Sequence, residues 1–399
     1  MHKEPSSGNA LDPALQKAID ALHARDAETL ALTRSWVEIN SFTENVAGVN
    51  KVGALLREAF ALPGLSCTVI PGGDGFGDHM IWRTAAATRE GAKPILLIGH
   101  HDTVFPPGHF EGWKEEGGKA TGPGALDMKG GLAIIRTTVA ALADVGALAA
   151  LPLVVVCVAD EEVGSPSSTP HLKAAAQGAA AALVFESGRA ADAIITRRRG
   201  VGAMTVVAHG KAAHAGNNHK DGVNAILALA KFIEAAQGLT DYARGRTVNV
   251  GLVQGGTSKN TVPERAECSL DLRYETVEDA ERLVGEVRAA AAAAQAAVPG
   301  VRLEVTGGAR RLPLERTEAS AKLRDEYAAC ARAVGLGDGE APQLGGGSDA
   351  NTVAPLGVPA IDGLGPRGAG FHTSHEYVEL ATFALKAEAL LRFLWGRRT

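Results

Sequence analysis

The chain has 399 residues, of which 46% are hydrophobic, 21% are charged and 5% are aromatic, and its formal net charge at pH 7 is -5. This length predicts two domains, and the composition is typical of an ordinary soluble α/β protein rather than a fibrous or disordered chain. Because charges of both signs are interspersed, the sequence offers no electrostatic footprint for nucleic acid or an anionic membrane. The short basic run Arg197–Arg199 is more typical of a solvated strand edge.

The cysteines and the hydropathy pattern point to an intracellular setting. The four cysteines lie far apart and form no C-x-x-C pair, which argues against a disulfide framework and against a zinc ribbon. The first residues lack the apolar stretch of a signal peptide, and no later stretch reaches membrane-spanning length. We therefore expect a cytoplasmic protein that has no membrane partner.

The first half of the chain predicts an α/β unit. After a polar leader, residues 13–61 carry helical periodicity, and a further helix is expected near residues 129–148. Apolar runs that lack alternation argue for a mostly parallel sheet that is covered on both faces. In such a sheet, ligands gather at the carboxyl ends of the strands. The expected strands are residues 67–70, 80–83, 94–99, 151–159 and 181–185.

The pattern changes near residue 197, where apolar residues begin to alternate with small or polar ones, as in antiparallel strands with one solvated face. The parallel-type pattern resumes with a helix near 319–334 and a strand at 358–362. The sequence thus predicts an α/β/α domain formed by residues 1–196 and 307–399, with an inserted α+β domain, of ferredoxin-like type, at 197–306. The inserted domain is expected to contain strands at 201–207, 247–253, 266–274 and 301–305 and helices near 223–237 and 277–298.

Acidic residues and imidazoles recur where predicted strands end. His100 and Asp102 follow one strand, the adjacent acids Glu161 and Glu162 follow the next, and Glu186 follows a third. An acidic neighbour such as Asp102 could fix the tautomer of a metal-binding His100. Consecutive acids released by a buried strand repel one another unless a cation neutralises them. Because adjacent side chains on extended backbone diverge, one of Glu161 and Glu162 could bind metal while the other acts as a base.

Two further residues complete a possible metal centre. Asp127 follows a loop that contains Gly122 and Gly124, and it could either cap the next helix or point a carboxylate at a metal pair. His372 lies near the end of the chain, after a predicted strand and a flexible loop. A solvated acidic turn is the alternative reading of residues 160–162. Taken together, these side chains suffice for two divalent ions, which in such sites lie roughly 3.5–4 Å apart and activate a bridging water.

The ordered motifs resemble those of the M20 metallopeptidase family, and most closely its glutamate carboxypeptidase (carboxypeptidase G2-like) branch. The resemblance spans roughly residues 30–395 and includes a strand-end Glu at position 186. The other motifs are H-x-D at 100–102, G-P-G-x-x-D at 122–127, D-E-E-x-G-S at 160–165, G-K-A-x-H-A-G at 210–216, N-x-x-P at 260–263, D-x-R at 271–273, G-G-G-S-D-A at 345–350 and H-x-x-x-E at 372–376.

The resemblance implies two divalent metal ions, zinc by analogy, although the same ligand types also accept cobalt or manganese. It implies that Asp102 orients His100 and that Glu161 is the general base, which takes a proton from the bridging water and passes it to the leaving amine. The implied metal ligands are His100 and Glu186 for one ion, Glu162 and His372 for the other, and Asp127 for both.

The resemblance also implies that the inserted domain is a lid and a homodimerisation domain. His214 would help to stabilise the oxyanion, in many family members by reaching the partner subunit's site. Asn260 and Arg273 would bind the free carboxylate of the substrate, for which an arginine fork is well suited. A further substrate-binding arginine near the hinge would be Arg311 or Arg310.

The expected function is hydrolysis of an amide or peptide bond next to a free carboxylate, which releases a C-terminal amino acid such as glutamate. An N-acyl amino acid deacylase or a dipeptidase of the same family is the alternative. A catalytically silent metal or amino-acid binding protein would have no chemical need for Glu161. The spacing from His372 to Glu376 is shorter than in the glutamate-cleaving relatives, so the side-chain preference stays open.

Overall fold

The computed structural model describes residues 11–398, which divide into two compact units. The large unit contains residues 11–196 together with residues 316–341 and 356–398, and the inserted unit contains residues 197–315 and 342–355. The expected polar leader falls on residues 1–10, which lie outside the described part of the chain.

The domain boundaries expected from the sequence need one correction. The expected division after residue 196 coincides with the division between the units, but the one expected after residue 306 falls inside strand β13 (Arg302–Arg311). Strand β13 pairs with β8 (Gly200–His209) along almost its whole length, so it cannot be divided between two units. The segment 342–355 also belongs to the inserted unit, where Asn351 Nδ2 donates hydrogen bonds to the carbonyls of Arg199 and Leu312 at 3.3 and 2.9 Å.

The large unit is built on a mixed, mostly parallel six-stranded sheet with the order β1-β2-β6-β3-β7-β14, as the sequence predicts in the main. The last four strands in this order run parallel, whereas β2 is antiparallel to both β1 and β6. The two central strands are fully buried, and they carry no polar side chain before His100 at the end of β3. The strands are β1 (Leu65–Ile70), β2 (His79–Thr84), β3 (Ile95–His100), β6 (Leu153–Val158), β7 (Ala181–Val184) and β14 (Ala360–Ile361).

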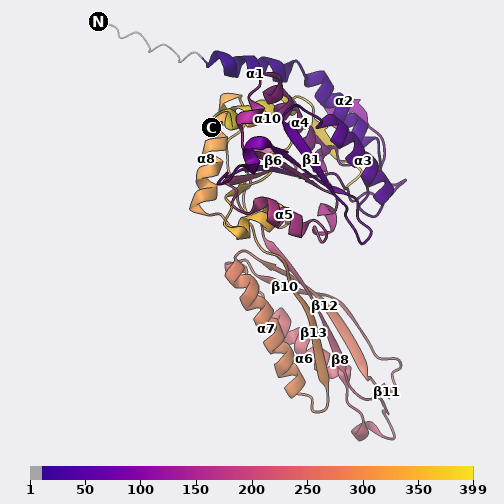
Figure 1. The fold of residues 1–399 in the computed structure, drawn as a ribbon. Coiled ribbons are helices and arrows are strands. Elements are labelled where there is room, and N and C mark those ends of the chain that lie inside the picture. The colour runs from indigo at the N-terminus through magenta and orange to yellow at the C-terminus, as the bar shows by residue number, and fades with distance from the viewer. Residues whose placement is uncertain (1–10, 399) are drawn as a thin grey trace. The chain divides into compact units, whose positions relative to one another are not determined.

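Helices cover this sheet on both faces, with α4 and α10 packed together on one side and α5 on the other (Figure 1). A second, small sheet has the order β15-β16-β5-β4. Among residues 11–398, no helix has the length and apolar character needed to cross a membrane. The helices are α1 (Pro13–His23), α2 (Asp26–Val37), α3 (Val46–Ala59), α4 (Gly130–Asp144), α5 (Thr169–Ala176), α8 (Glu318–Ala333) and α10 (Thr382–Trp395), and the small strands are β4 (Lys114–Glu116), β5 (Lys119–Thr121), β15 (Gly368–Ala369) and β16 (Tyr377–Glu379).

The inserted unit is an antiparallel sheet with the order β10-β12-β8-β13, covered on one face by two helices (Figure 1). Burial alternates residue by residue along β8 and β12, as expected for strands with one solvated face. The chain beyond β8 pairs again in a short two-stranded extension, β9 with β11. The remaining elements are β9 (Ala213–His214), β10 (Thr247–Gly255), β11 (Thr261–Val262), β12 (Arg265–Tyr274), α6 (Ala225–Gln237), α7 (Val277–Ala296) and the short α9 (Ala350–Val353).

Candidate metal centre and substrate-binding residues

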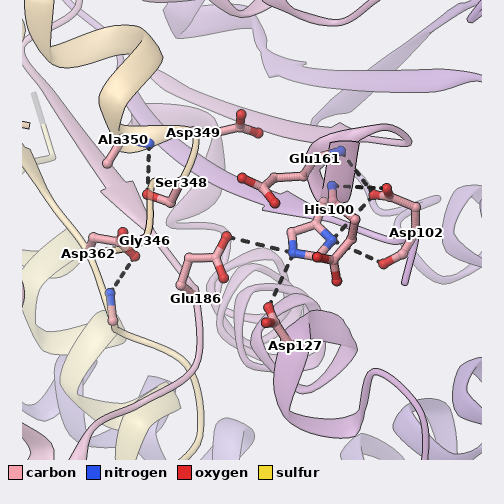
Figure 2. Close-up of polar contacts among 12 residues, drawn as sticks. His100, Asp102, Asp127, Glu161, Glu186, Gly346, Ser348, Asp349, Ala350 and Asp362 are labelled. Atoms are coloured by element: carbon pink, nitrogen blue, oxygen red, sulfur yellow. Dashed lines mark hydrogen bonds and ion pairs between the residues drawn. The ribbon is translucent and has the colours of Figure 1, made fainter. Parts of the chain in front are cut away.

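Three neighbouring parallel strands bring the candidate ligands to one edge of the large sheet. His100 is the last residue of β3, which lies between β6 and β7. Glu161 and Glu162 follow β6, and Glu186 follows β7. Because the carboxyl ends of parallel strands meet at one edge, these side chains converge, and Figure 2 shows the carboxylates of Glu161 and Glu186 beside His100.

Asp127 lies between two imidazoles. Its Oδ1 is 3.3 Å from Nε2 of His100, and its Oδ2 is 3.4 Å from Nε2 of His372. The alternative that Asp127 caps the next helix is wrong, because α4 begins after Lys129 and has no side-chain cap. The backbone of Asp127 is instead non-helical, with φ -121° and ψ 90°, and its peptide bond to Met128 is cis. The two distances show that the single carboxylate of Asp127 faces both histidines.

Each imidazole has a second carboxylate of its own. Glu186 Oε1 is 3.6 Å from His100 Nε2, and Glu162 Oε2 is 3.1 Å from His372 Nε2. Ligand atoms also lie within 4.8 Å of one another in two groups, His100 with Glu161 and Glu186, and His100 with Asp127 and Glu162. Glu161 and Glu162, although adjacent in sequence, thus belong to different groups.

Asp102 holds several parts of this cluster together. Its Oδ1 is 3.3 Å from His100 Nδ1, and it accepts a hydrogen bond from Thr43 Oγ1 at 2.8 Å. The backbone N–H groups of Glu161 and Glu162 donate to its two oxygens, each at 3.2 Å, and Figure 2 shows the bond from Glu161. Asp102 is fully buried, so it fixes both the His100 ring and the turn that carries the two glutamates.

The close approach of buried charged groups shifts the pKa values of the side chains in this cluster. Burial disfavours the charged form of His100, but the carboxylates of Asp102 and Asp127 outweigh it and raise the pKa of this imidazole well above its usual value. Hydrogen bonds to Asp127 and Glu162 raise the pKa of His372 to about 10. Burial and the charge of Asp127 raise the pKa of Glu162 to about 8 and also raise that of Glu186.

These residues fit a pair of divalent cations. Nε2 of His100 and Oδ1 of Asp127 are buried atoms that face each other at 3.3 Å but form no hydrogen bond of good geometry, as expected of atoms reserved for a metal. Imidazole nitrogens and carboxylate oxygens are the ligand types that zinc, cobalt and manganese accept. Loss of either imidazole would leave buried carboxylates that repel one another without a counter-charge.

Two arginines of the inserted unit share one row of its sheet. Arg273 on β12 and Arg311 on β13 both pair with Val201 of the intervening strand β8, so their side chains leave the same face. Arg273 forms two hydrogen bonds with Asp271, at 2.8 and 3.0 Å, and donates to the Gly345 carbonyl at 3.2 Å.

Of the two candidate hinge arginines, Arg311 is the more buried. Its side chain is 10% exposed, and Nη2 lies 3.2 Å from Oδ1 of Asp349, whereas Arg310 is exposed. Together with the hydrogen bond from Arg273 to Gly345, this ion pair places both arginines of the row against the glycine-rich segment 345–349.

His214 and Asn260 lie at the opposite end of the same unit. His214 on β9 pairs with Thr261, and the carbonyl of Asn260 accepts a hydrogen bond from the N–H of Ala215 at 2.9 Å. Nδ1 of His214 accepts the N–H groups of residues 216 and 217, which leaves Nε2 of this exposed ring available as a donor. The pairing of β9 with β11 thus brings these two predicted residues together and separates them from Arg273.

The structure adds two residues to which the sequence assigned no role. Glu376 is completely buried and accepts hydrogen bonds from the backbone N–H groups of Leu126 and Asp127. Its place in the H-x-x-x-E motif was the available signal. Arg198 is 5% exposed and donates to the Gly346 carbonyl at 3.2 Å, so the interpretation of its basic run as a solvated edge is wrong for this residue.

The fold and the site define a metallohydrolase whose α/β unit carries an inserted dimerisation domain. Residues 196–299 match the family model of the peptidase dimerisation domain. Over 350 residues the chain is 30% identical to carboxypeptidase G2 from Pseudomonas sp. (strain RS-16), a match that covers 86% of this chain and 83% of that protein. The chain belongs to the M20 family of metallopeptidases.

Other relatives differ in the activity that their names state. A succinyl-diaminopimelate desuccinylase from Xanthomonas oryzae pv. oryzae (strain MAFF 311018) is 26% identical over 385 residues, covering 89% of this chain and 94% of that protein. The aminopeptidase PepT from Bacillus cereus ATCC 10987 superposes with a TM-score of 0.75 at 22% identity, over 94% of this chain and 99% of that one. Bacillus subtilis YXEP, a dinuclear metal-binding peptidase of the M20 family, superposes with a TM-score of 0.69 at 16% identity, over 94% of this chain and 99% of that one. At these identities the solved structures show a common fold.

Proposed function

We propose that the protein is a metal-dependent carboxypeptidase-type amidohydrolase that cleaves an amide bond next to a free carboxylate and releases an amino acid such as glutamate. The observation that carries the substrate class is the row formed by Arg273 and Arg311, two cationic forks on one face of one sheet. The 30% sequence identity to carboxypeptidase G2 over most of both chains supports the same substrate class.

In this proposal, one carboxylate joins two metal positions. His100 and Glu186 would hold one ion, Glu162 and His372 the other, and Asp127 both, in agreement with the pairing of the distances described above. When bound, two divalent ions would polarise the scissile carbonyl and lower the pKa of the attacking water. Zinc, cobalt and manganese all suit these ligands.

Glu161 is proposed as the general base. Its carboxylate lies within the 4.8 Å group that it forms with His100 and Glu186, and its backbone is held by Asp102. A carboxylate in this position can accept a proton from water at its Oε atoms and then donate the proton to the leaving amine nitrogen. Because Glu162 serves the other group, the two neighbouring acids divide the tasks of base and ligand between them.

Arg273 is proposed to bind the substrate carboxylate, so Arg273→Ala should raise KM about 10- to 100-fold, as expected for a lost hydrogen bond to a charged group, and should change kcat much less. Steady-state kinetics measure both constants. Arg265→Ala is the matched control, because Arg265 lies on the same strand and pairs with Glu267 just as Arg273 pairs with Asp271. Equal KM values for the two variants would contradict this role.

His214 is proposed to act on the substrate of a partner subunit in a homodimer. Arg273 and Arg265 face opposite ends of β8, about 26 Å apart for eight residues of extended strand, and His214 lies beyond the Arg265 end. A substrate of amino-acid size cannot contact both His214 and Arg273 of one chain. The edge strand β10 exposes Leu252 and Val253, which are 72% and 65% exposed, and thus offers an apolar edge for a second copy.

A mixing experiment tests this arrangement. His214→Ala and Glu161→Gln proteins are each expected to be inactive, but random mixing of their subunits should restore about one quarter of the wild-type turnover, because half of the dimers are hybrids with one intact site. Unfolding and refolding the mixture, followed by an activity assay, measures the recovery. The same mixture carrying Leu252→Glu in every chain should recover nothing. Absence of recovery in hybrids shown to have formed would place His214 in its own subunit's site.

Metal affinity is expected to rise with pH. The raised pKa values of His372, about 10, and Glu162, about 8, mean that both groups carry protons at neutral pH, and a metal ion must displace them. Zn²⁺ binding should therefore be weakest near pH 6 and strengthen up to about pH 9, with protons released. Calorimetry in two buffers of different ionisation enthalpy measures that release. Affinity that is constant over this range would contradict the assignment of these two ligands.

A substrate panel tests the function itself. Purified protein loaded separately with Zn²⁺, Co²⁺ or Mn²⁺ would be assayed with a folate-type N-acyl glutamate, N-acetyl amino acids, N-succinyl-diaminopimelate and dipeptides. The proposal predicts the highest kcat/KM for the N-acyl glutamate. A preference for the succinyl substrate would favour the second candidate, a deacylase, in line with the desuccinylase relative. No amino acid released from any substrate would exclude both candidates.

A further inference from the structure

Glu376 is a buried acid close to the candidate metal centre, and its carboxylate accepts hydrogen bonds from backbone N–H groups. Its side chain is completely buried, and its Oε1 accepts the N–H of Leu126 at 2.8 Å and the N–H of Asp127 at 3.1 Å. The two segments are 250 residues apart in sequence. They meet because β16, which begins at Tyr377, pairs with β5, which ends at Thr121 just before the loop that carries Asp127.

The loop at Asp127 needs such a partner. Asp127 and Met128 have non-helical backbone angles, so their N–H groups are not aligned by the helix that follows. At the same time, the two oxygens of Asp127 face two different imidazoles at 3.3 and 3.4 Å, which requires a fixed direction of its Cα–Cβ bond. A rigid acceptor on the backbone N–H of Asp127 supplies that direction.

We propose that Glu376 is a positioning residue, whose buried carboxylate fixes the Asp127 peptide so that one side chain can serve both metal ions. The inference rests on the proposed function in so far as Asp127 is the shared ligand. It predicts that Glu376 acts on metal affinity through hydrogen-bond geometry and touches neither the metal nor the substrate. Supporting groups around metal ligands change affinity by about 10- to 100-fold when they are removed.

The test is a Zn²⁺ titration of metal-free full-length protein against a chelating dye, for which no turnover is needed. Glu376→Ala should weaken Zn²⁺ binding about 10- to 100-fold, whereas Glu376→Gln, whose amide oxygen can accept the same two hydrogen bonds, should stay within about threefold of wild type. Glu379→Ala is the control, because Glu379 lies only three residues further on, in β16, and pairs with Arg367 at 2.8 Å instead.

Glu376→Asp keeps the carboxylate, but its side chain is one methylene too short to reach the loop. This variant should therefore bind Zn²⁺ as weakly as the alanine variant. It replaces the alanine variant in the test if Glu376→Ala does not fold. Wild-type affinity in Glu376→Asp or Glu376→Ala, or a loss in Glu376→Gln equal to that in Glu376→Ala, would overturn the inference. Hydrolysis of substrate by the wild-type protein is measured in a separate assay. A protein that binds Zn²⁺ but hydrolyses nothing refutes the proposed function and leaves the affinity comparison valid.

Discussion

Replacing Glu161 with Gln is expected to lower kcat by about 10²- to 10⁴-fold, the contribution of a positioned general base, while two metal ions remain bound. The amide keeps the shape of the side chain and its backbone hydrogen bond to Asp102, but it cannot accept a proton at neutral pH. Steady-state kinetics and metal analysis of the same sample give the two readouts.

The metal content decides between two roles for this residue. Glu161 belongs to a group of possible ligand atoms with His100 and Glu186. If Glu161 were a metal ligand and not the base, the Glu161→Gln protein would lose one metal ion per chain. Glu90→Gln, at an exposed loop position, should leave both kcat and metal content unchanged. Full activity of Glu161→Gln would exclude it as the base.

Replacing Asp127 with Ala is expected to abolish turnover and to weaken the binding of both metal ions by more than about 100-fold, because both imidazoles lose the carboxylate that they share. Ligand binding stabilises the native state by about 2.7 kcal/mol at 100 times Kd, so the wild-type Tm should rise with added Zn²⁺. That rise should disappear in the variant.

Glu186→Ala is the informative comparison for this substitution. Of the two imidazoles, Glu186 faces His100 and not His372, so its loss should weaken the binding of one ion and leave the other bound. Titration with Zn²⁺ followed by thermal unfolding distinguishes the two patterns. If Asp127→Ala lost a single ion, as Glu186→Ala should, Asp127 would not be the shared ligand.

The parts of this molecule that could be predicted from sequence follow from strong local patterns. The buried runs of β3 and β6 have no polar residue before His100 ends β3, and the strand-end rule then brings His100, Glu161 and Glu186 to one edge of the sheet. The direction of β1 and β2 could not be predicted in this way, because an apolar run carries no information on whether its neighbour is parallel.

Other features depend on contacts between distant parts of the chain. The hydrogen bonds of Glu376 to the Asp127 loop exist only because β16 returns to β5. The burial of Arg198 depends on the irregular segment 342–355, which has no periodic pattern that would assign it to the inserted unit. For these residues, local sequence favoured a solvated or unassigned position, and tertiary packing decided otherwise.

The route of the chain between its units constrains how such proteins can be recombined. The backbone crosses from one unit to the other after residues 196, 315, 341 and 355, so the inserted unit is not a cassette bounded by two cuts. A chimera that exchanged only residues 197–306 would carry Arg273 away from the native Gly345 carbonyl and divide β13. The residues that we propose to recognise the substrate would then come from two parents. Such a hybrid should keep the dimerisation preference of the parent that supplied residues 197–306 without that parent's substrate selectivity.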